Sequence, residues 1–409
     1  MKPTLALIAA SCIFTAVAVA QPPNYTITDL GPVGGTPGQP FYIAHNGLIS
    51  GAAAMPDGTM RAVLWYKGWR GDLGPLTLGG QNSVAFGVNE RALTVGQAET
   101  SIPDPKAEDF CGFKQLGLPA AGTTCQPFIW KSGVTTALPT LGGNNGAANQ
   151  INASGTVVGL AETATPDTNC PAPQVLQFKP VIWESGQVQE LPVVAGDLNG
   201  AAFGINNHGQ AVGASGDCGV FSPTLLVNLT ALHAVLWDTG TSTDLGNLGG
   251  TGRGQGNVAF NLNNRGQVVG ESDLPGDVTN HAFMWNSDTG MLDLGTLPGD
   301  VNSAGLGIND RGVVVGVSLD ANFNLRAFFW QYGVMLDLNT LVPADSPLFL
   351  ILACSINERG EIIGVGVNKT TGDTHAYIAT PARSGFSSEN AVASPMADQQ
   401  KRFAKLVRR

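Results

Sequence analysis

Short apolar segments alternate with polar turn sequences along most of this chain, and the alternation follows a repeated phrase. The phrase Ile-Asn-x-x-Gly-x-Val-Val-Gly occurs seven times, in five clear and two degenerate copies. The clear copies are residues 151–159, 205–213, 262–270, 308–316 and 356–364, and the degenerate copies are residues 43–51 and 88–96. Their closing glycines stand 45 to 63 residues apart, a spacing that indicates propeller blades once insertions are allowed.

Each copy predicts a tight hairpin between two short strands. Asparagine first and glycine fourth in Asn-x-x-Gly are typical of a type I turn, because the amide caps the turn and glycine accepts positive φ. A small residue four positions before the asparagine, such as Ala202, suits a strand at a crowded axis. The Val-Val-Gly that follows predicts a second strand whose glycine permits close backbone approach.

Two further segments complete the repeated unit. The third segment ends in an aromatic residue, which is large enough to fill the gap between stacked sheets. These residues are Trp65, Trp130, Trp183, Trp237, Trp285, Trp330 and Tyr377. The fourth segment reads Asp-Leu-Gly or a relative and follows each of the six tryptophans but not Tyr377. A matching Asp29-Leu30-Gly31 stands instead near the N-terminus.

The displaced segment predicts a closed ring. We expect an all-β fold, a seven-bladed β-propeller with four-stranded blades over residues 21–381, whose last blade is closed by the N-terminal strand. A right-handed β-solenoid is the main alternative. It stacks rungs at a shorter and more even period and has no use for exchanged termini.

Composition agrees with a repeat array and limits the partners. The 409 residues exceed the usual size of one hydrophobic core, while 54 glycines suit many tight turns. Hydrophobic residues make up 43% of the chain, enough for a packed core. The net charge of −10 argues against nucleic acid as a partner, because phosphates require a basic surface.

The two ends of the chain differ from the repeats. Residues 1–20 have the pattern of a signal peptide with cleavage after Ala20, which predicts a secreted or cell-surface protein. No later apolar stretch is long enough to predict a transmembrane segment. Residues 382–409 form a basic tail that we expect to be flexible and to suit contact with an anionic envelope surface.

Five cysteines remain after the predicted signal peptide, and export favours disulfides among them. We expect Cys111 to pair with Cys125 and Cys170 with Cys218. Cys354 lies in an apolar run and is expected to be a buried free thiol.

The four paired cysteines lie in long insertions between the second and third segments of three consecutive units. These insertions are residues 97–125, 160–178 and 214–232. They predict an irregular, crosslinked cap over one sector of the propeller. Loop surfaces of this kind usually carry function.

The sequence also resembles a known family. The run His281-Ala282-Phe283-Met284-Trp285, with residues 293–297 and 308–312, resembles the bacterial extracellular repeat family named for its His-Ala-Phe triplet (HAF repeat proteins). The similarity covers nearly all of residues 25–380. It implies an exported repeat protein with a propeller-like fold and without a settled activity. The chain departs from the triplet in most units, where the histidine position holds Arg61, Gln126, Lys179, His233, His281, Arg326 and His375.

The repeat separates scaffold residues from candidate site residues. His233, His281 and His375 share one repeat position and are interpreted as structural. Four residues instead break the pattern in loops that lead into the next inner strand, and we predict that they rim the channel mouth and bind ligand: Asp197, Asn199, Asp300 and Asn302. Asp-x-Asn is a weak calcium signal without a complete calcium loop, so neither a metal site nor a cofactor is predicted.

The sequence favours binding over catalysis. It holds no Gly-x-Ser-x-Gly, His-Glu-x-x-His or Cys-x-x-Cys motif and no phosphate-binding glycine loop. We therefore expect an exported, non-catalytic binding or scaffold protein that presents a loop-built face to a polysaccharide or protein. One alternative is an extracellular polymer hydrolase or lyase that uses Asp197 or Asp300 at the channel mouth. Another is an envelope component tethered by the basic tail.

Overall fold

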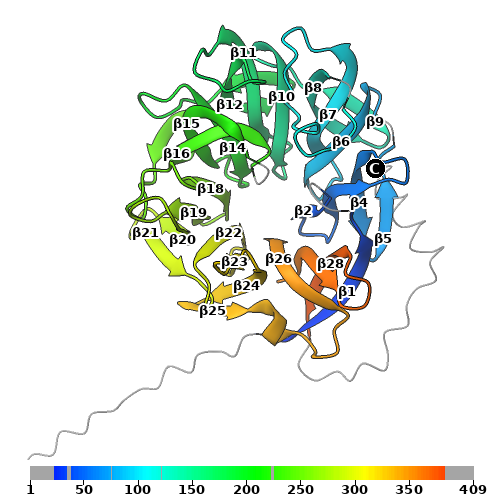
Figure 1. Cartoon of the computed structure of the whole chain (residues 1–409), viewed down its shortest axis with the longest axis vertical. Coiled ribbons are helices and arrows are strands. Elements are labelled where there is room, and N and C mark those ends of the chain that lie inside the picture. Colours follow the sequence, from blue (N-terminus) through cyan, green and yellow to red (C-terminus); the bar gives the residue numbers. More distant parts are fainter. Residues whose placement is uncertain (1–22, 35–37, 75, 121, 223–224, 383–409) are drawn as a thin grey trace, which may run out of the picture.

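The computed structural model describes residues 23–382 except 35–37, 75, 121, 223 and 224. The predicted signal peptide and nearly all of the predicted tail therefore lie outside the described residues. Seven antiparallel sheets of four strands stand around a central axis like the blades of a propeller (Figure 1). The predicted all-β, seven-bladed fold is confirmed, and the solenoid alternative is excluded.

Within a blade the strands follow one another from the axis outwards. Blade one comprises β2 (Pro40–Ile43), β3 (Ile49–Ala54), β4 (Met60–Tyr66) and β5 (Trp69–Asp72). Blade two comprises β6 (Gly79–Val88), β7 (Thr94–Pro103), β8 (Thr123–Lys131) and β9 (Val134–Ala137). Blade three comprises β10 (Gly142–Ile151), β11 (Val157–Pro166), β12 (Leu176–Glu184) and β13 (Gln187–Glu190). Blade four comprises β14 (Asn199–Ile205), β15 (Ala211–Ser222), β16 (Val227–Asp238) and β17 (Thr241–Asp244).

The remaining three blades repeat this order. Blade five comprises β18 (Val258–Leu262), β19 (Val268–Asp273), β20 (Asn280–Asn286) and β21 (Gly290–Gly295). Blade six comprises β22 (Asn302–Ile308), β23 (Val314–Leu319), β24 (Leu325–Gln331) and β25 (Val334–Asp337), followed by a short 3₁₀ helix η1 (Leu338–Leu341). Blade seven comprises β26 (Leu348–Ile356), β27 (Ile362–Asn368), β28 (Thr374–Pro381) and β1 (Tyr25–Pro32).

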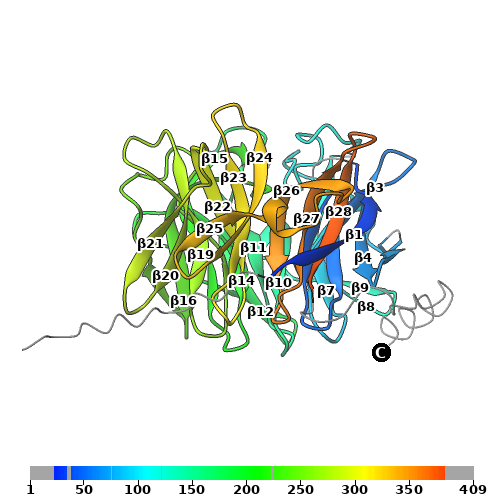
Figure 2. The same cartoon turned by 90° about the horizontal axis from the view of Figure 1, so that it is seen from below.

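The N-terminal strand closes blade seven, as predicted. β1 pairs antiparallel with β28 from Tyr25 opposite Pro381 to Pro32 opposite His375. Both views show β1 lying along the outer side of β28 (Figures 1 and 2). Tyr25 and Leu30 are buried by this pairing, so the strand contributes apolar surface as well as backbone hydrogen bonds to the last blade.

The repeated asparagines link the blades around the axis. Each Oδ1 caps its own turn, as at Asn263, where it accepts the backbone N–H groups of Arg265 and Gln267 at 3.0 Å. Each Nδ2 donates to the backbone carbonyl of the equivalent asparagine in the next blade. The pairs run from Asn89 to Asn152 (3.0 Å), Asn152 to Asn206 (3.2 Å), Asn206 to Asn263 (3.1 Å), Asn263 to Asn309 (3.0 Å) and Asn309 to Asn357 (3.2 Å).

The degenerate first copy keeps the belt closed by other means. Asn357 donates to the carbonyl of Ala44 at 3.4 Å, and Asn46 donates to the carbonyl of Glu90 at 3.1 Å. At each of the seven junctions between blades, an asparagine side-chain amide therefore donates a hydrogen bond to a backbone carbonyl of the next blade. We call this set the asparagine belt.

The tryptophans fill the spaces between blades, as predicted. Trp65, Trp183 and Trp237 are among the largest fully buried side chains. Two of them also bond to the preceding blade, because Nε1 of Trp183 donates to the carbonyl of Pro139 at 2.8 Å and Nε1 of Trp237 to that of Pro192 at 2.7 Å. Tyr377 is buried at the corresponding place in blade seven.

The cysteine predictions are confirmed, but the cap is more regular than expected. Cys111 pairs with Cys125, Cys170 pairs with Cys218, and Cys354 is free and buried. Residues 97–125 and 160–178 contain irregular segments. Residues 214–232, however, form most of a long hairpin, because β15 and β16 extend beyond the blade and stay paired up to Ser222 and Val227. The Cys170–Cys218 bond therefore ties a loop of blade three to a strand of blade four.

The asparagine belt predicts that the loss of one of its side-chain amides lowers the free energy of unfolding strongly. Asn263→Ala removes bonds to two backbone N–H groups, to Gln267 and to the carbonyl of Asn309. Because these groups lie at a buried site, we expect a loss of about 2 to 4 kcal/mol in the free energy of unfolding, measured by urea denaturation. Asn322→Ala, at an exposed turn, should change it by less than about 0.5 kcal/mol. Equal effects of the two variants would contradict the role of the belt.

Ring closure predicts that the N-terminal strand is needed for full stability. Deleting residues 23–32 leaves β28 as an edge strand, and we expect the thermal unfolding midpoint to fall by about 5 to 10 °C. A synthetic peptide of the same ten residues should restore part of the loss. Deleting residues 400–409 is the length-matched control, and an equal shift in both truncated chains is the result that disagrees with closure.

Candidate binding site in the central channel

A cavity of about 550 Å³ occupies the central channel on the face where second strands connect to third strands. One residue from the inner strand of each blade lines it, always three positions before the belt asparagine or its equivalent. These residues are Phe41, Phe86, Asn149, Phe203, Phe260, Leu306 and Cys354. We call them the channel ring. Four of the seven are phenylalanines, so the middle of the channel is aromatic rather than polar.

A local irregularity of the inner strand turns these side chains towards the axis. In β14 the pairing with β15 passes from Ala202 to Gly204 and omits Phe203, and the same shift omits Phe260 in β18 and Leu306 in β22. Every inner strand has a register shift at this position. A β-bulge places one extra residue outside the pairing and re-aims its side chain.

The bulge also explains the closing glycine of the repeat. A Cβ on Gly270 would overlap the carbonyl oxygen of Val258, and a Cβ on Gly213 would overlap that of Ala201. Because the bulged strand passes so close, only glycine fits opposite it. The Ile-Asn-x-x-Gly-x-Val-Val-Gly phrase therefore encodes the geometry that exposes the channel ring.

The phenylalanines form two pairs across neighbouring blades. The rings of Phe41 and Phe86 meet edge to face with centroids 5.0 Å apart, and those of Phe203 and Phe260 lie 6.0 Å apart. Asn149 stands between the pairs and donates to the carbonyl of Ala202 at 2.9 Å. The four rings are only partly buried in a chain that buries most of its large side chains. Such a concave aromatic surface is typical of a ligand site.

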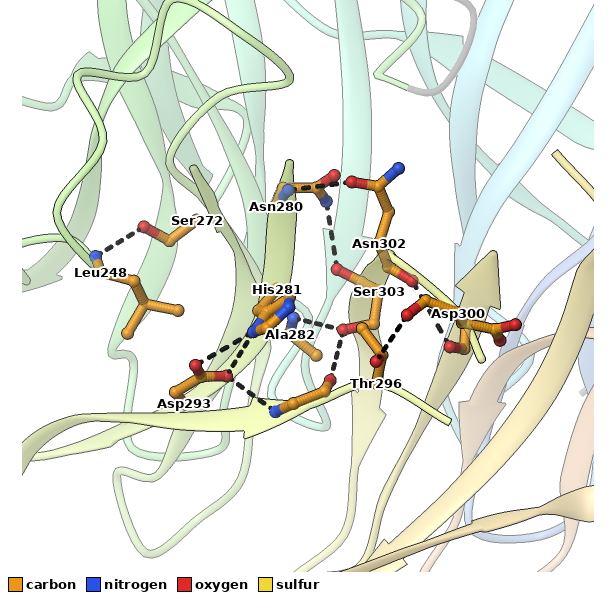
Figure 3. Close-up of polar contacts among 12 residues, drawn as sticks. Leu248, Ser272, Asn280, His281, Ala282, Asp293, Thr296, Asp300, Asn302 and Ser303 are labelled. Carbon is orange, nitrogen blue, oxygen red and sulfur yellow. Dashed lines mark hydrogen bonds and ion pairs between the residues drawn. The ribbon is translucent and has the colours of Figure 1, made fainter. Parts of the chain in front are cut away.

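Glu271 brings a carboxylate into the same cavity. Its Oε2 accepts a hydrogen bond of 2.8 Å from Nδ2 of Asn280. The same amide nitrogen also donates to the carbonyl of Ser303 at 3.1 Å (Figure 3). Burial, with a smaller contribution from the charge of Asp273, raises the pKa of Glu271 to about 8. The carboxyl group is therefore largely protonated at neutral pH when the channel holds no cation.

The opposite end of the channel is narrower and more polar. A cavity of about 240 Å³ lies there, lined by Glu90, Asp310 and Glu358 and by belt asparagines that include Asn206 and Asn263. These carboxylates also join blades: Glu358 accepts the backbone N–H of Asp310 at 2.9 Å, and Glu90 accepts that of His45 at 3.2 Å. Burial, and then the neighbouring Asp310, raise the pKa of Glu358. We interpret this end as part of the scaffold.

Two of the sequence-predicted site residues lie between blades three and four. Asp197 is buried and accepts hydrogen bonds from Oγ of Ser215 at 2.5 Å and from Nδ1 of His233 at 2.9 Å. Asn199 is fully buried, accepts the backbone N–H of Phe178 at 3.0 Å and donates to Asp167 at 2.9 Å. Neither residue is among those lining the two channel cavities.

The other two predicted residues lie between blades five and six (Figure 3). Asp300 forms a 2.7 Å ion pair with Arg326, and its side chain is only 2% exposed. Asn302 accepts the backbone N–H of Asn280 at 3.0 Å and does line the wide cavity. The structure thus brings one of the four residues to the channel, and ligand binding by the other three stays a prediction without a contact to support it.

The repeated histidine position forms structural pairs. His281 contacts Asp293 at 3.0 Å, and His375 contacts Asp29 at 2.8 Å across the blade closure. Among the described residues, no group of three or more histidine, cysteine, aspartate or glutamate side chains is arranged to hold a metal ion.

A buried carboxylate cluster lies under the crosslinked loops. Glu108 accepts the backbone N–H groups of Val175 and Leu176 at 2.6 and 2.9 Å. Gln174 joins it to Glu162, because Nε2 of Gln174 donates to Glu108 at 3.2 Å and to Glu162 at 2.9 Å. Burial, and then the charge of Glu108, raise the pKa of Glu162 to about 8. The cluster connects the loop of blade two to that of blade three.

This cluster predicts acid-favoured stability. The folded-state pKa of Glu162 lies above its ordinary 4.5, so its contribution is fully present below about pH 4.5 and is lost as pH rises through about 8. We expect the thermal midpoint of the wild type to fall over this interval under non-reducing conditions. Glu162→Gln should flatten the decline, and what remains includes the similar contribution of Glu271. An exposed control, Glu190→Gln, should keep the pH dependence of the wild-type thermal midpoint. If Glu162→Gln also keeps the wild-type pH dependence, Glu162 is not the source of the decline.

Comparisons with known proteins add little beyond the fold. A comparison with protein-family models finds no match, and a search of curated proteins finds none either. The resemblance to the His-Ala-Phe repeat family therefore stays a prediction. The chain is similar to the β-propeller domain of the Trilobed protease from Pyrococcus furiosus, with 13% identity, 73% of this chain and 80% of that chain covered, and a TM-score of 0.44.

Two further structures have weaker likeness. Trypanosoma rangeli sialidase is 9% identical, with 87% of this chain and 57% of that chain covered and a TM-score of 0.37. Aleuria aurantia lectin, in a complex with Fucα1-6GlcNAc, is 7% identical, with 79% of this chain and 97% of that chain covered and a TM-score of 0.35. At such low identity, none of these proteins indicates what this chain binds.

Proposed function

We propose that this protein is an exported, non-catalytic binding propeller whose ligand enters the wide mouth of the central channel. The channel ring carries the proposal, because seven bulges direct one side chain per blade, four of them phenylalanine, into one cavity of about 550 Å³. That volume lies within the usual range of ligand sites, about 300 to 1,000 Å³. The two disulfides support export, since they fit an oxidising compartment. No helix among the described residues is long and apolar enough to span a membrane.

The face that carries the wide mouth favours a protein over a polysaccharide as the ligand. Four large apolar side chains are exposed where second strands connect to third strands: Ile102, Val220, Val278 and Phe323, with exposed fractions of 63%, 76%, 83% and 75%. Phe323 lines the cavity, and the other three lie on the same face of the propeller. Exposed apolar groups on the face of an aromatic channel suit a partner that inserts an apolar group and covers that face. The extended hairpin of β15 and β16 leans to the same mouth, where Ser222 and Leu225 line the cavity.

The arrangement gives less support to polymer hydrolysis. Glycoside hydrolysis commonly uses two carboxylates about 5 to 10 Å apart. Among the described residues, Glu271 is the one carboxylate that lines the wide cavity. Asp197 and Asp300, the candidates for the alternative function, are buried in pairs with His233 and Arg326.

Replacing two phenylalanines of the channel ring with alanine tests the site. The neutral dye Nile red, titrated by fluorescence, should bind the wild type, and the double variant Phe203→Ala/Phe260→Ala should weaken binding by about tenfold or more, since both rings face the cavity. Tyr332→Ala is a control because its 70% exposed ring lies at a third-to-fourth-strand turn, away from the mouth.

Peptide and polysaccharide arrays probed with the wild type and with the Phe203→Ala/Phe260→Ala variant then test the class of ligand. Selective peptide binding that is lost in the double variant supports a protein ligand. Polysaccharide binding that is lost in the same double variant would instead identify a polysaccharide as the ligand and contradict the proposal of a protein ligand. Equal dye binding by wild type and double variant would refute the channel as the site.

A further inference from the structure

We propose that the wide mouth of the channel recognises an amine-bearing apolar group, with the ammonium held by Glu271 and the apolar body among the phenylalanines of the channel ring. This inference rests on the proposed binding function and adds the chemical class of the inserted group. A free aromatic amine and a peptide with an N-terminal aromatic residue both present this chemistry.

The repeat marks Glu271 as an exception. It occupies the position just after the closing glycine of the phrase, where the other blades hold Ala52, Gln97, Leu160, Ala214, Val317 and Val365. Five of these six residues are apolar and one is an uncharged amide. The fold therefore does not need a carboxylate at this position, and its presence in the cavity wall calls for another explanation.

Glu271 also lacks an internal counter-charge. Its Oε2 is bonded to Asn280, while none of the described residues donates to Oε1. No lysine, arginine or histidine occurs among the described residues that line the wide cavity. Glu271 is only 8% exposed, so water solvates the ionised carboxylate poorly, and burial raises its pKa to about 8. A cation in the cavity would supply what the surroundings of this group lack.

The side chains that flank Glu271 supply no cation. Its neighbours across the two strand pairs, Val258 of β18 and Ala282 of β20, are apolar and fully buried. Aromatic faces attract cations, so the phenylalanines of the ring are compatible with an ammonium as well as with a ring or aliphatic body. A negatively charged ligand would find no lysine, arginine or histidine among the described residues that line the cavity to balance its charge, and should bind most weakly.

Binding should be coupled to proton release. In the empty channel at neutral pH, Glu271 holds its proton; when an ammonium binds, the carboxyl O–H bond breaks, the proton passes to the solvent and an ion pair forms. The other charged neighbour is Asp273 of the same strand, which is fully buried and accepts the backbone N–H groups of residues 254–256. From the other elements, Asn280 of β20 and Asn302 of β22 face this region and do not titrate.

Three probes with one aromatic body test the inference on the full exported chain: 2-phenylethylamine, 2-phenylethanol and 3-phenylpropionate. By isothermal titration calorimetry at pH 7, we expect the amine to bind about tenfold or more tightly than the alcohol and the carboxylate to bind most weakly. Titrations of the amine in two buffers with different ionisation enthalpies should reveal proton release.

Glu271→Gln is the decisive variant, because glutamine keeps the size and the bond to Asn280 and removes the charge. It should weaken amine binding by about tenfold or more, abolish proton release and leave alcohol binding within about twofold. Glu184→Gln, on an exposed part of β12, should bind all probes as the wild type does. A peptide that begins with phenylalanine, with its amino group free or acetylated, shows whether a chain terminus can supply the amine, and acetylation should abolish its binding.

The possible failures are distinguishable. If alcohol and amine bind equally, or if Glu271→Gln retains amine affinity, the inference is wrong, whereas binding that still depends on Phe203 and Phe260 leaves the proposed function intact. If Nile red binds and none of the three probes does, the inference is also overturned. Loss of Nile red binding together with a lowered thermal midpoint in Glu271→Gln would show that Glu271 acts through the fold.

Discussion

The ring depends on one amide side chain used twice. In each repeat the asparagine accepts from its own turn and donates to the backbone of the next blade, so the local hairpin and the contact between blades are set by the same group. A buried amide that satisfies all its hydrogen-bonding atoms is costly to replace. The blades therefore meet at a fixed spacing around the axis, and the channel has a defined width.

Because the belt and the tryptophans hold the blades, the channel ring is free to vary. Its residues sit outside the strand pairing, where a bulge requires an extra residue but not a particular side chain. Phenylalanine, asparagine, leucine and cysteine all occupy this position. The scaffold and the binding surface are thus encoded at neighbouring positions of the same phrase, and one can change without the other.

The scaffold was predictable from the sequence because it recurs. Asn263, Trp237 and the displaced Asp29 each belong to a repeated position, and the structure assigns each the expected structural place. The hydrogen bonds between blades were not predictable, because a turn motif alone does not reveal which atom the side-chain NH₂ group of its asparagine contacts. The asparagine belt could only be seen once neighbouring repeats were placed side by side.

The candidate site was harder to predict. The small residue before Phe203 was interpreted as the axial position, whereas the bulge places the next side chain there. The recurring Phe after this small residue was the available signal. Asp197 and Asp300 do break the repeat, but they pair with His233 and Arg326, which occupy the variable position of the triplet. Each of these aspartates therefore occurs together with a basic residue that lies far from it in the sequence, and a single sequence does not reveal such pairs. Glu271 has a signal in the sequence, because the other six copies hold no charged residue at its position, but its place in the cavity wall is visible only in the structure.

The closure of blade seven has a consequence for folding. β1 is synthesised first, yet its partner β28 is more than 300 residues away, as the contact between Asp29 and His375 shows. Hairpins of the other six blades form between strands that are neighbours in sequence, while this pairing must wait for nearly the whole chain. Until then, β1 is an unpaired strand with apolar residues such as Tyr25 uncovered. The step that completes the ring is therefore also the one most exposed to pairing with a second, incomplete chain.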